Sequence, residues 1–119
     1  MRNQPTPIVT PEDVERVVHR EFSGSQIAEA FSILLAYGSE EWHREPERVH
    51  VAALKLAGGD LGGLRRAIEN ASTDYRDVLA LAEYPEYVRS VDPSLSISPE
   101  ERQQIIDADC KQYSEWLSR

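Results

Sequence analysis

Apolar residues recur every three or four positions along most of this chain, which is the pattern of amphipathic α-helices. The first such run begins at Thr10-Pro11, where threonine caps a helix and proline suits its first position, and it stops at Gly24. The second begins behind Ser25, which can cap it, and stops at Gly38. Because this second helix is apolar on most sides, we expect it to be the central and most buried one.

The middle of the chain predicts an αα-hairpin of two helices, over about 46–57 and 61–84. Pro46 suits the first position of the first helix. Gly58-Gly59 follows that helix, and Asp60 can cap the next one. A glycine just past a helix often has a positive φ, so we expect this conformation at Gly58.

The second helix of the hairpin has an unbroken seam of apolar residues. Their spacing alternates three and four from Leu61 to Ala82. We therefore expect one continuous helix that ends at Pro85. Ser72 and Thr73 both favour caps, so a break near Ser72 is the alternative.

The remaining segments complete a single domain. Residues 1–9 predict a loose arm, residues 88–98 a connecting loop and residues 99–118 a C-terminal helix behind a Ser98-to-Glu101 capping box. No segment combines strand alternation with flanking turns. The predicted fold is therefore all-α, a five- or six-helix bundle over residues 1–119 that is built on the αα-hairpin.

Composition and charge indicate which classes of partner and which cellular compartment to expect. The 119 residues carry a formal net charge of −8, which disfavours nucleic acid and anionic membranes because phosphate repels such a surface. The single cysteine, Cys110, cannot form an internal disulfide, which fits a reducing compartment. The N-terminal residues lack the apolar run of a signal peptide, and no apolar window approaches the roughly 20 residues of a membrane span. We expect a soluble, cytoplasmic protein.

Two segments of the hairpin carry a resemblance. They read ERVHVAALKLAGGDL, from Glu47, and DYRDVLALAEYP, from Asp74. The chain here resembles a family of small uncharacterised bacterial proteins with a similar "LAILKLxxGDL…DYRDVLxxAEYP" segment, over about residues 45–87. The resemblance implies helices and a bacterial source, and it implies no particular activity.

One group of residues has the spacing of metal ligands. His43, Glu47 and His50 would share a face of a continuous helix, and this ligand set suits zinc or iron. Pro46 lies among them and can break that face. We therefore favour a solvated, charged face and predict no metal, with a metal site as the alternative.

A second group predicts an interaction surface. Its charged members include Arg76, Asp77 and Glu83, of which Arg76 and Glu83 lie two helical turns apart. One interpretation is a docking or small-ligand surface, with arginine as the anion anchor. The other is a set of ion pairs and tyrosine hydroxyls that hold the hairpin against other helices. The C-terminal helix adds aromatic residues to an apolar face that something must cover. The possible interaction surface comprises Arg76, Asp77, Glu83, Tyr84, Tyr87, Tyr113 and Trp116.

No catalytic or cofactor motif stands out in the sequence. Cys110 has no histidine near it in the chain, so we interpret it as a small core residue. Gly58-Gly59 and Gly62-Gly63 follow a helix and lack the lysine of a phosphate-binding loop. The sequence favours a non-enzymatic protein without a cofactor that acts through protein contacts, with another protein or with itself as a homodimer. The alternative is a metal-binding or small-ligand-binding protein or enzyme.

Overall fold

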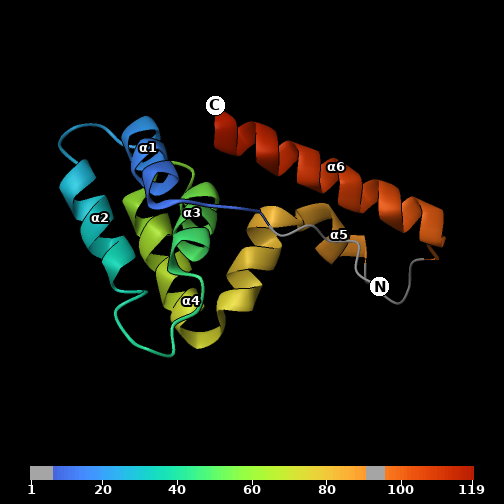
Figure 1. Cartoon of the computed structure of the whole chain (residues 1–119), viewed down its shortest axis with the longest axis horizontal. Helices are drawn as coiled ribbons and strands as arrows, with labels where there is room; N and C mark the ends of the chain where they lie inside the picture. The colour runs from blue at the N-terminus through green and yellow to red at the C-terminus, as the bar shows by residue number, and fades with distance from the viewer. Residues whose placement is uncertain (1–6, 91–95) are drawn as a thin grey trace.

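The computed structural model describes residues 7–90 and 96–119, and all of its regular secondary structure in these ranges is helical (Figure 1). The all-α prediction is therefore confirmed. No helix in the described ranges is long and apolar enough to cross a membrane. The helices are α1 (Pro11–Glu21), α2 (Ile27–Leu35), α3 (Pro46–Ala57), α4 (Leu61–Glu83), α5 (Pro85–Ser90) and α6 (Pro99–Ser118).

The centre of the molecule is α3, which packs against α4 on one side and α1 on the other. Its residues 49–54 are all buried. By contrast, α2 buries only Ala30 and Leu34 and leaves Leu35 exposed. The prediction that the second helix is the most buried one is thus wrong. This nine-residue helix lies at the edge of the bundle and packs mainly on α4 and α1. Ile27, Phe31 and Ile33 are therefore only partly buried against the core, and Leu35 stays exposed.

The predicted αα-hairpin is present as α3 and α4. Gly58 ends α3 with φ 59° and ψ 35°, and Asp60 caps α4 by accepting a 2.7 Å hydrogen bond from the Gly63 amide. A Cβ atom at Gly63 would lie 3.3 Å from the backbone of Ala57. Glycine at 63 therefore lets the start of α4 approach the end of α3 closely.

The long helix α4 is broken at one residue. Asp74 has φ −153° and ψ 99°, so two helical segments meet there. Its Oδ1 accepts a 3.1 Å hydrogen bond from the Arg76 amide, which is how an N-cap residue begins a new helix. The prediction of one continuous helix is therefore wrong, and the alternative of a break near Ser72 is correct to within two residues. The apolar seam continues across the break because both segments pack on the same core.

Element ends differ in detail from the sequence predictions. The Thr10 capping box and the Ser98 capping box are both confirmed. The first helix ends at Glu21, before Gly24, and the second ends at Leu35, before Gly38. The N-cap of α2 is Gln26 without a side-chain hydrogen bond, so Ser25 does not cap it. The predicted loose arm, residues 1–9, is described only from residue 7, and residues 7–10 have no regular secondary structure.

The predicted connecting loop, residues 88–98, begins inside a helix. α5 covers Pro85–Ser90, and residues 91–95 of that loop lie outside the described residues. A residue far along the chain explains α5: the Asp109 carboxylate accepts hydrogen bonds from the amides of Glu86 (3.4 Å) and Tyr87 (2.9 Å). A cap supplied from α6 in this way has no local sequence signal.

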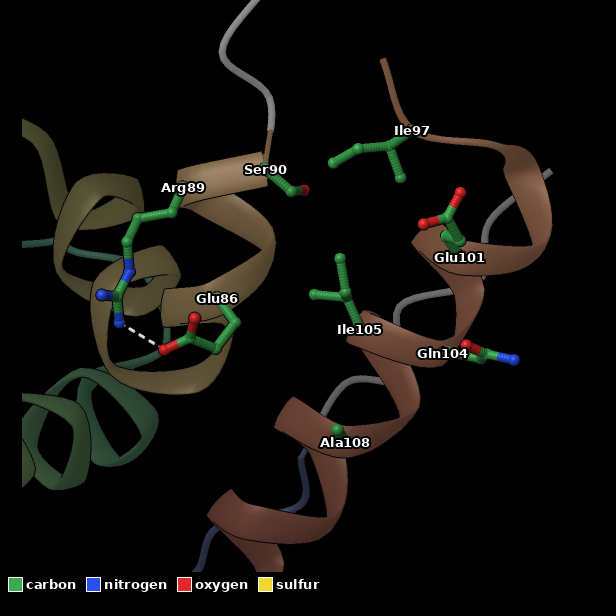
Figure 2. Close-up of a pocket in the computed structure, with 8 residues that line it drawn as sticks. All are labelled: Glu86, Arg89, Ser90, Ile97, Glu101, Gln104, Ile105 and Ala108. Atoms are coloured by element: carbon green, nitrogen blue, oxygen red, sulfur yellow. Dashed lines mark hydrogen bonds and ion pairs between the residues drawn. The ribbon is translucent and has the colours of Figure 1, made fainter. Parts of the chain in front are cut away.

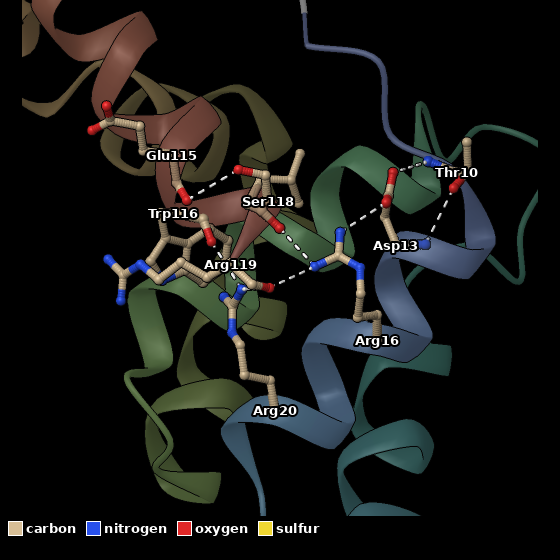
Figure 3. A network of polar contacts seen from close by, with 9 residues as sticks. Thr10, Asp13, Arg16, Arg20, Glu115, Trp116, Ser118 and Arg119 are labelled. Carbon is tan, nitrogen blue, oxygen red and sulfur yellow. Dashed lines mark hydrogen bonds and ion pairs between the residues drawn. The ribbon is translucent and has the colours of Figure 1, made fainter.

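The C-terminal helix folds back on the chain itself. Arg16 and Arg20 of α1 donate hydrogen bonds of 2.8–3.1 Å to the last carbonyls of α6, from Trp116, Leu117 and Arg119 (Figure 3). The Arg20 guanidinium also lies 4.7 Å from the Trp116 ring centroid. Cations at a helix C-terminus are stabilising because they meet the negative end of the helix dipole. The predicted interaction face of α6 is therefore buried within the monomer, with Tyr113 and Trp116 in the core.

We predict that Gly58→Val destabilises the protein by about 1–2 kcal/mol, because a residue with a Cβ is strained in the left-handed conformation. Open space surrounds the position, so a clash would not contribute. Thermal or urea denaturation measures the change. Gly24→Val is the matched control, since Gly24 has equal space and no positive φ; equal losses in both variants would contradict the prediction.

Candidate functional site

Two hollows meet at the break in α4, and both are lined by Thr73 and Asp74. The first, which we call the docking groove, has a volume of about 490 Å³. Leu56 and Leu81 line it with 41% and 48% of their surfaces exposed, and Asp77 also lines it. Its full lining is Leu56, Asn70, Thr73, Asp74, Asp77, Val78, Ala80, Leu81 and Val88.

The second hollow, of about 400 Å³, presents Trp42 with 62% of its surface exposed. The turn that carries Trp42 is fixed by its neighbours. His43 Nδ1 accepts hydrogen bonds from the Gly38 amide (2.8 Å) and the Glu40 amide (3.2 Å), and its ring stacks on Tyr37. The indole packs edge-on against His43 at 4.1 Å between ring centroids. Trp42 is therefore held in place while remaining open to solvent.

A cleft of about 330 Å³ between α3, α4 and α5 contains a buried ion pair. Arg48 of α3 donates from Nε and one terminal nitrogen to the two oxygens of Glu83 in α4, at 2.8 and 2.7 Å. The other terminal nitrogen donates to Glu45 at 2.8 Å. Glu83 is only 2% exposed, so this pair joins α3 to the second segment of α4 inside the protein.

The ion pair determines what the cleft can do chemically. Hydrogen bonds to Glu83 raise the pKa of Arg48, so the guanidinium remains charged. Each of its nitrogens already donates to a carboxylate, and each Glu83 oxygen already accepts. Burial raises the pKa of Tyr84 to about 12, so its phenol stays protonated at neutral pH. Arg48 and Glu83 therefore satisfy each other and serve the structure, whereas the exposed Arg76 at the edge of the cleft pairs with Asp74 through Nε.

The three candidate metal ligands are not brought together. His43 lies in the turn before α3, and its Nδ1 accepts backbone hydrogen bonds. His50 lies on α3, buried, with Nε2 2.7 Å from the Tyr37 carbonyl. Pro46 starts α3 after Glu45, whose φ of 48° turns the chain, so His43 shares no helix face with Glu47. In the described ranges, no three His, Cys, Asp or Glu side chains lie close enough to hold one metal ion.

The residues of the predicted interaction surface are divided among different sites. Arg76, Glu83, Tyr84 and Tyr87 line the ion-pair cleft, while Asp77 lines the docking groove. Tyr113 and Trp116 are buried on the inner face of α6, and Tyr113 lines a smaller cavity together with Glu83 and Tyr84. Cys110, predicted to be a core residue, is half-buried and free.

Sequence reasoning did not single out Arg48, Trp42, Leu56 or Leu81 as site residues. Leu56 follows the core spacing of α3, yet it is exposed, although Leu54 and Ala57 on either side of it in the chain are buried. The partner of Arg48 is 35 residues away. Only the packing of α3 on α4 reveals either feature.

A further hollow of about 510 Å³ lies between α5 and the first half of α6 (Figure 2). Ile97 and Ile105 face α5 across it, and Arg89 pairs with Glu86 on the same helix. Its charged residues on α5 thus neutralise each other. The hollow combines this apolar wall with the buried Ser90, whose hydroxyl already donates a 2.7 Å hydrogen bond to the Tyr87 carbonyl.

Comparisons with protein-family models, with curated proteins and with solved structures returned no match for this chain. The resemblance of residues 45–87 to a bacterial family therefore stays a prediction.

We predict that Glu83→Leu destabilises the protein by roughly 3 kcal/mol, because it leaves the largely buried Arg48 charge with only the exposed Glu45 as a partner. The double variant Arg48→Met, Glu83→Leu should recover most of this loss, since apolar side chains of similar volume can replace a buried ion pair. Urea denaturation of both variants and of Arg48→Met measures the coupling between the two positions. Additive losses would show that the two side chains do not depend on each other.

We predict that His50 makes stability depend on pH. Burial lowers the pKa of His50 below its ordinary value of 6.5, so near that pH the unfolded chain binds more protons than the folded one. Stability should then fall as pH falls through 6.5, and His50→Gln should flatten the curve of melting temperature between pH 7.5 and 5.5. The exposed His19, changed to Gln, is the control. An unchanged slope in His50→Gln would contradict the prediction.

Proposed function

We propose that this chain is a non-enzymatic cytoplasmic protein that acts by binding a partner protein in the docking groove. The observation that supports it most is the pairing of Leu56 and Leu81 in one hollow. Large apolar side chains exposed together beside a concave surface are typical of protein-binding sites. The paired charges of the ion-pair cleft and the separated histidines favour contact over catalysis.

The hollow next to the groove supports the same proposal. Trp42, Tyr75 and Arg76 line it, and tryptophan, tyrosine and arginine are the residue types that most often dominate binding energy. Because the Trp42 ring is already held by His43, little side-chain entropy would be lost on binding. A partner that crosses the α4 break would contact both hollows.

Charge indicates the chemistry of the partner. Asp74 and Asp77 lie at the docking groove, and the whole chain carries −8. A partner helix with an apolar stripe flanked by lysine or arginine would complement this surface and would be attracted to it at a distance. The same charge disfavours nucleic acid.

We predict that a photo-crosslinking amino acid at position 81 captures a partner in cells of the native host, whereas one at position 35 does not. Leu35 is the matched control, because it is an exposed leucine on α2, away from the groove. With the purified partner, Leu81→Lys should weaken binding at least about tenfold and Leu35→Lys should not, since only the first adds a charge to the apolar contact.

The outcomes separate the alternatives. Equal crosslinking at both positions, or none at position 81, would reject the docking groove. A crosslink to a second copy of the chain would retain a function through protein contacts as a homodimer, but it would reject a basic partner.

A further inference from the structure

The chain between α2 and α3 forms a closed turn over residues 37–44, and this turn carries Trp42. The Tyr37 hydroxyl joins its two ends. It donates a 2.8 Å hydrogen bond to the Arg44 carbonyl and accepts a 3.0 Å hydrogen bond from the Arg44 amide. The position of Trp42 therefore depends on what fills the inside of the turn.

The imidazole of His43 fills the inside of the turn as a hydrogen-bond acceptor. Gly38 and Glu40 donate to its Nδ1 from their backbone amides, at 2.8 and 3.2 Å, so Nδ1 can only accept. A neutral imidazole with its proton on Nε2 provides this acceptor, whereas an imidazolium has an N–H donor on both nitrogens. Protonation therefore removes both hydrogen bonds and leaves two amides facing a third donor. Histidine is the side chain that ordinarily takes up a proton between pH 5 and 8.

His43 also connects these hydrogen bonds to Trp42. Its ring stacks on Tyr37 with 4.3 Å between ring centroids, and the indole of Trp42 packs edge-on against it at 4.1 Å. An imidazolium can still lie on an aromatic ring, so protonation does not by itself displace His43 from Tyr37. It removes the hydrogen bonds that fix where the His43 ring lies. The indole then loses the fixed surface that holds it in the second hollow.

The titratable groups around His43 come from α2, the turn, α3 and α4. Burial raises the pKa of Tyr37, so its hydroxyl stays protonated, and burial lowers the pKa of His50, whose Nε2 lies 2.7 Å from the Tyr37 carbonyl. Asp74 and Arg76 of α4 line the second hollow and pair with each other. Within residues 7–90 and 96–119, no carboxylate forms an ion pair with His43. The other charged residues of the turn and of the start of α3 are Glu40, Glu41, Arg44, Glu45, Glu47 and Arg48.

We propose that His43 is a proton-sensitive latch on the turn that carries Trp42. With the imidazole neutral, the turn holds Trp42 in the second hollow. With the imidazole charged, the two amides are released and the indole is no longer held in one place. The latch is a property of the free protein, and only its consequence, weaker binding of a partner that contacts Trp42, rests on the proposed function.

Two substitutions at position 43 test the latch. In His43→Asn, the side-chain Oδ1 can accept from the same two amides and does not titrate. His43→Phe retains a ring that can stack on Tyr37 but has no acceptor. In NMR spectra of the full chain between pH 8 and 5, the amide protons of Gly38 and Glu40 should move upfield as His43 is protonated, and the Trp42 indole signal should change with the same midpoint. These signals should stay near their pH 8 positions in His43→Asn and should be displaced at every pH in His43→Phe.

His50→Gln is the matched control, because His50 is the other histidine at this turn. The pH-dependent shifts of the Gly38 and Glu40 amides should persist in this variant. Shifts that vanish in His50→Gln, or that remain in His43→Asn, would overturn the proposal, as would amide signals that do not follow the protonation of His43. The spectra are recorded without a partner, so the absence of a crosslink at position 81 would reject the docking groove and leave the latch standing.

Discussion

The packing of α3 against α4 is the contact on which the rest of the structure depends. It is fixed at both ends by different means. At the turn, glycine at 63 lets the two backbones come close. At the far end, Arg48 and Glu83 join the same two helices through a buried, two-point hydrogen-bonded pair. With both ends fixed, the other helices have a defined surface on which to pack.

The break at Asp74 lies between the two hollows that form the proposed docking surface. A straight α4 would present one continuous ridge, whereas the two segments leave a hollow on each side of Thr73 and Asp74. Asp74 stabilises the second segment by capping it, and its carboxylate also receives a hydrogen bond from Arg76 Nε at 3.1 Å. The polar residues that break the helix are thus the same ones that lie beside the exposed leucines and Trp42. The residues that break α4 therefore also shape the proposed docking surface.

The C-terminal helix completes the core and, with the end of α4, lines a cavity of about 250 Å³. Its end is held by Arg16 and Arg20 (Figure 3). Its middle supplies Asp109 to cap α5. Between these two attachments, Tyr113 is buried against the end of α4, and its hydroxyl has no hydrogen-bond partner within residues 7–90 and 96–119. Because the attachments are polar and specific, α6 is held in register while leaving space beneath it.

The sequence by itself determined the all-α class, the αα-hairpin, the glycine turn with its positive φ and both capping boxes. These features depend on residues within about one helical turn of each other, so their chemistry is visible in the local pattern. Tertiary structure alone decided that α3 is the buried helix, that Asp109 supports a helix at 85–90, and that Arg48 pairs with Glu83. It also decided that Tyr113 and Trp116 lie inside while Leu56 and Leu81 lie outside. Each of these depends on which helices meet across many residues of chain, and periodicity shows only that a face is apolar, not what covers it.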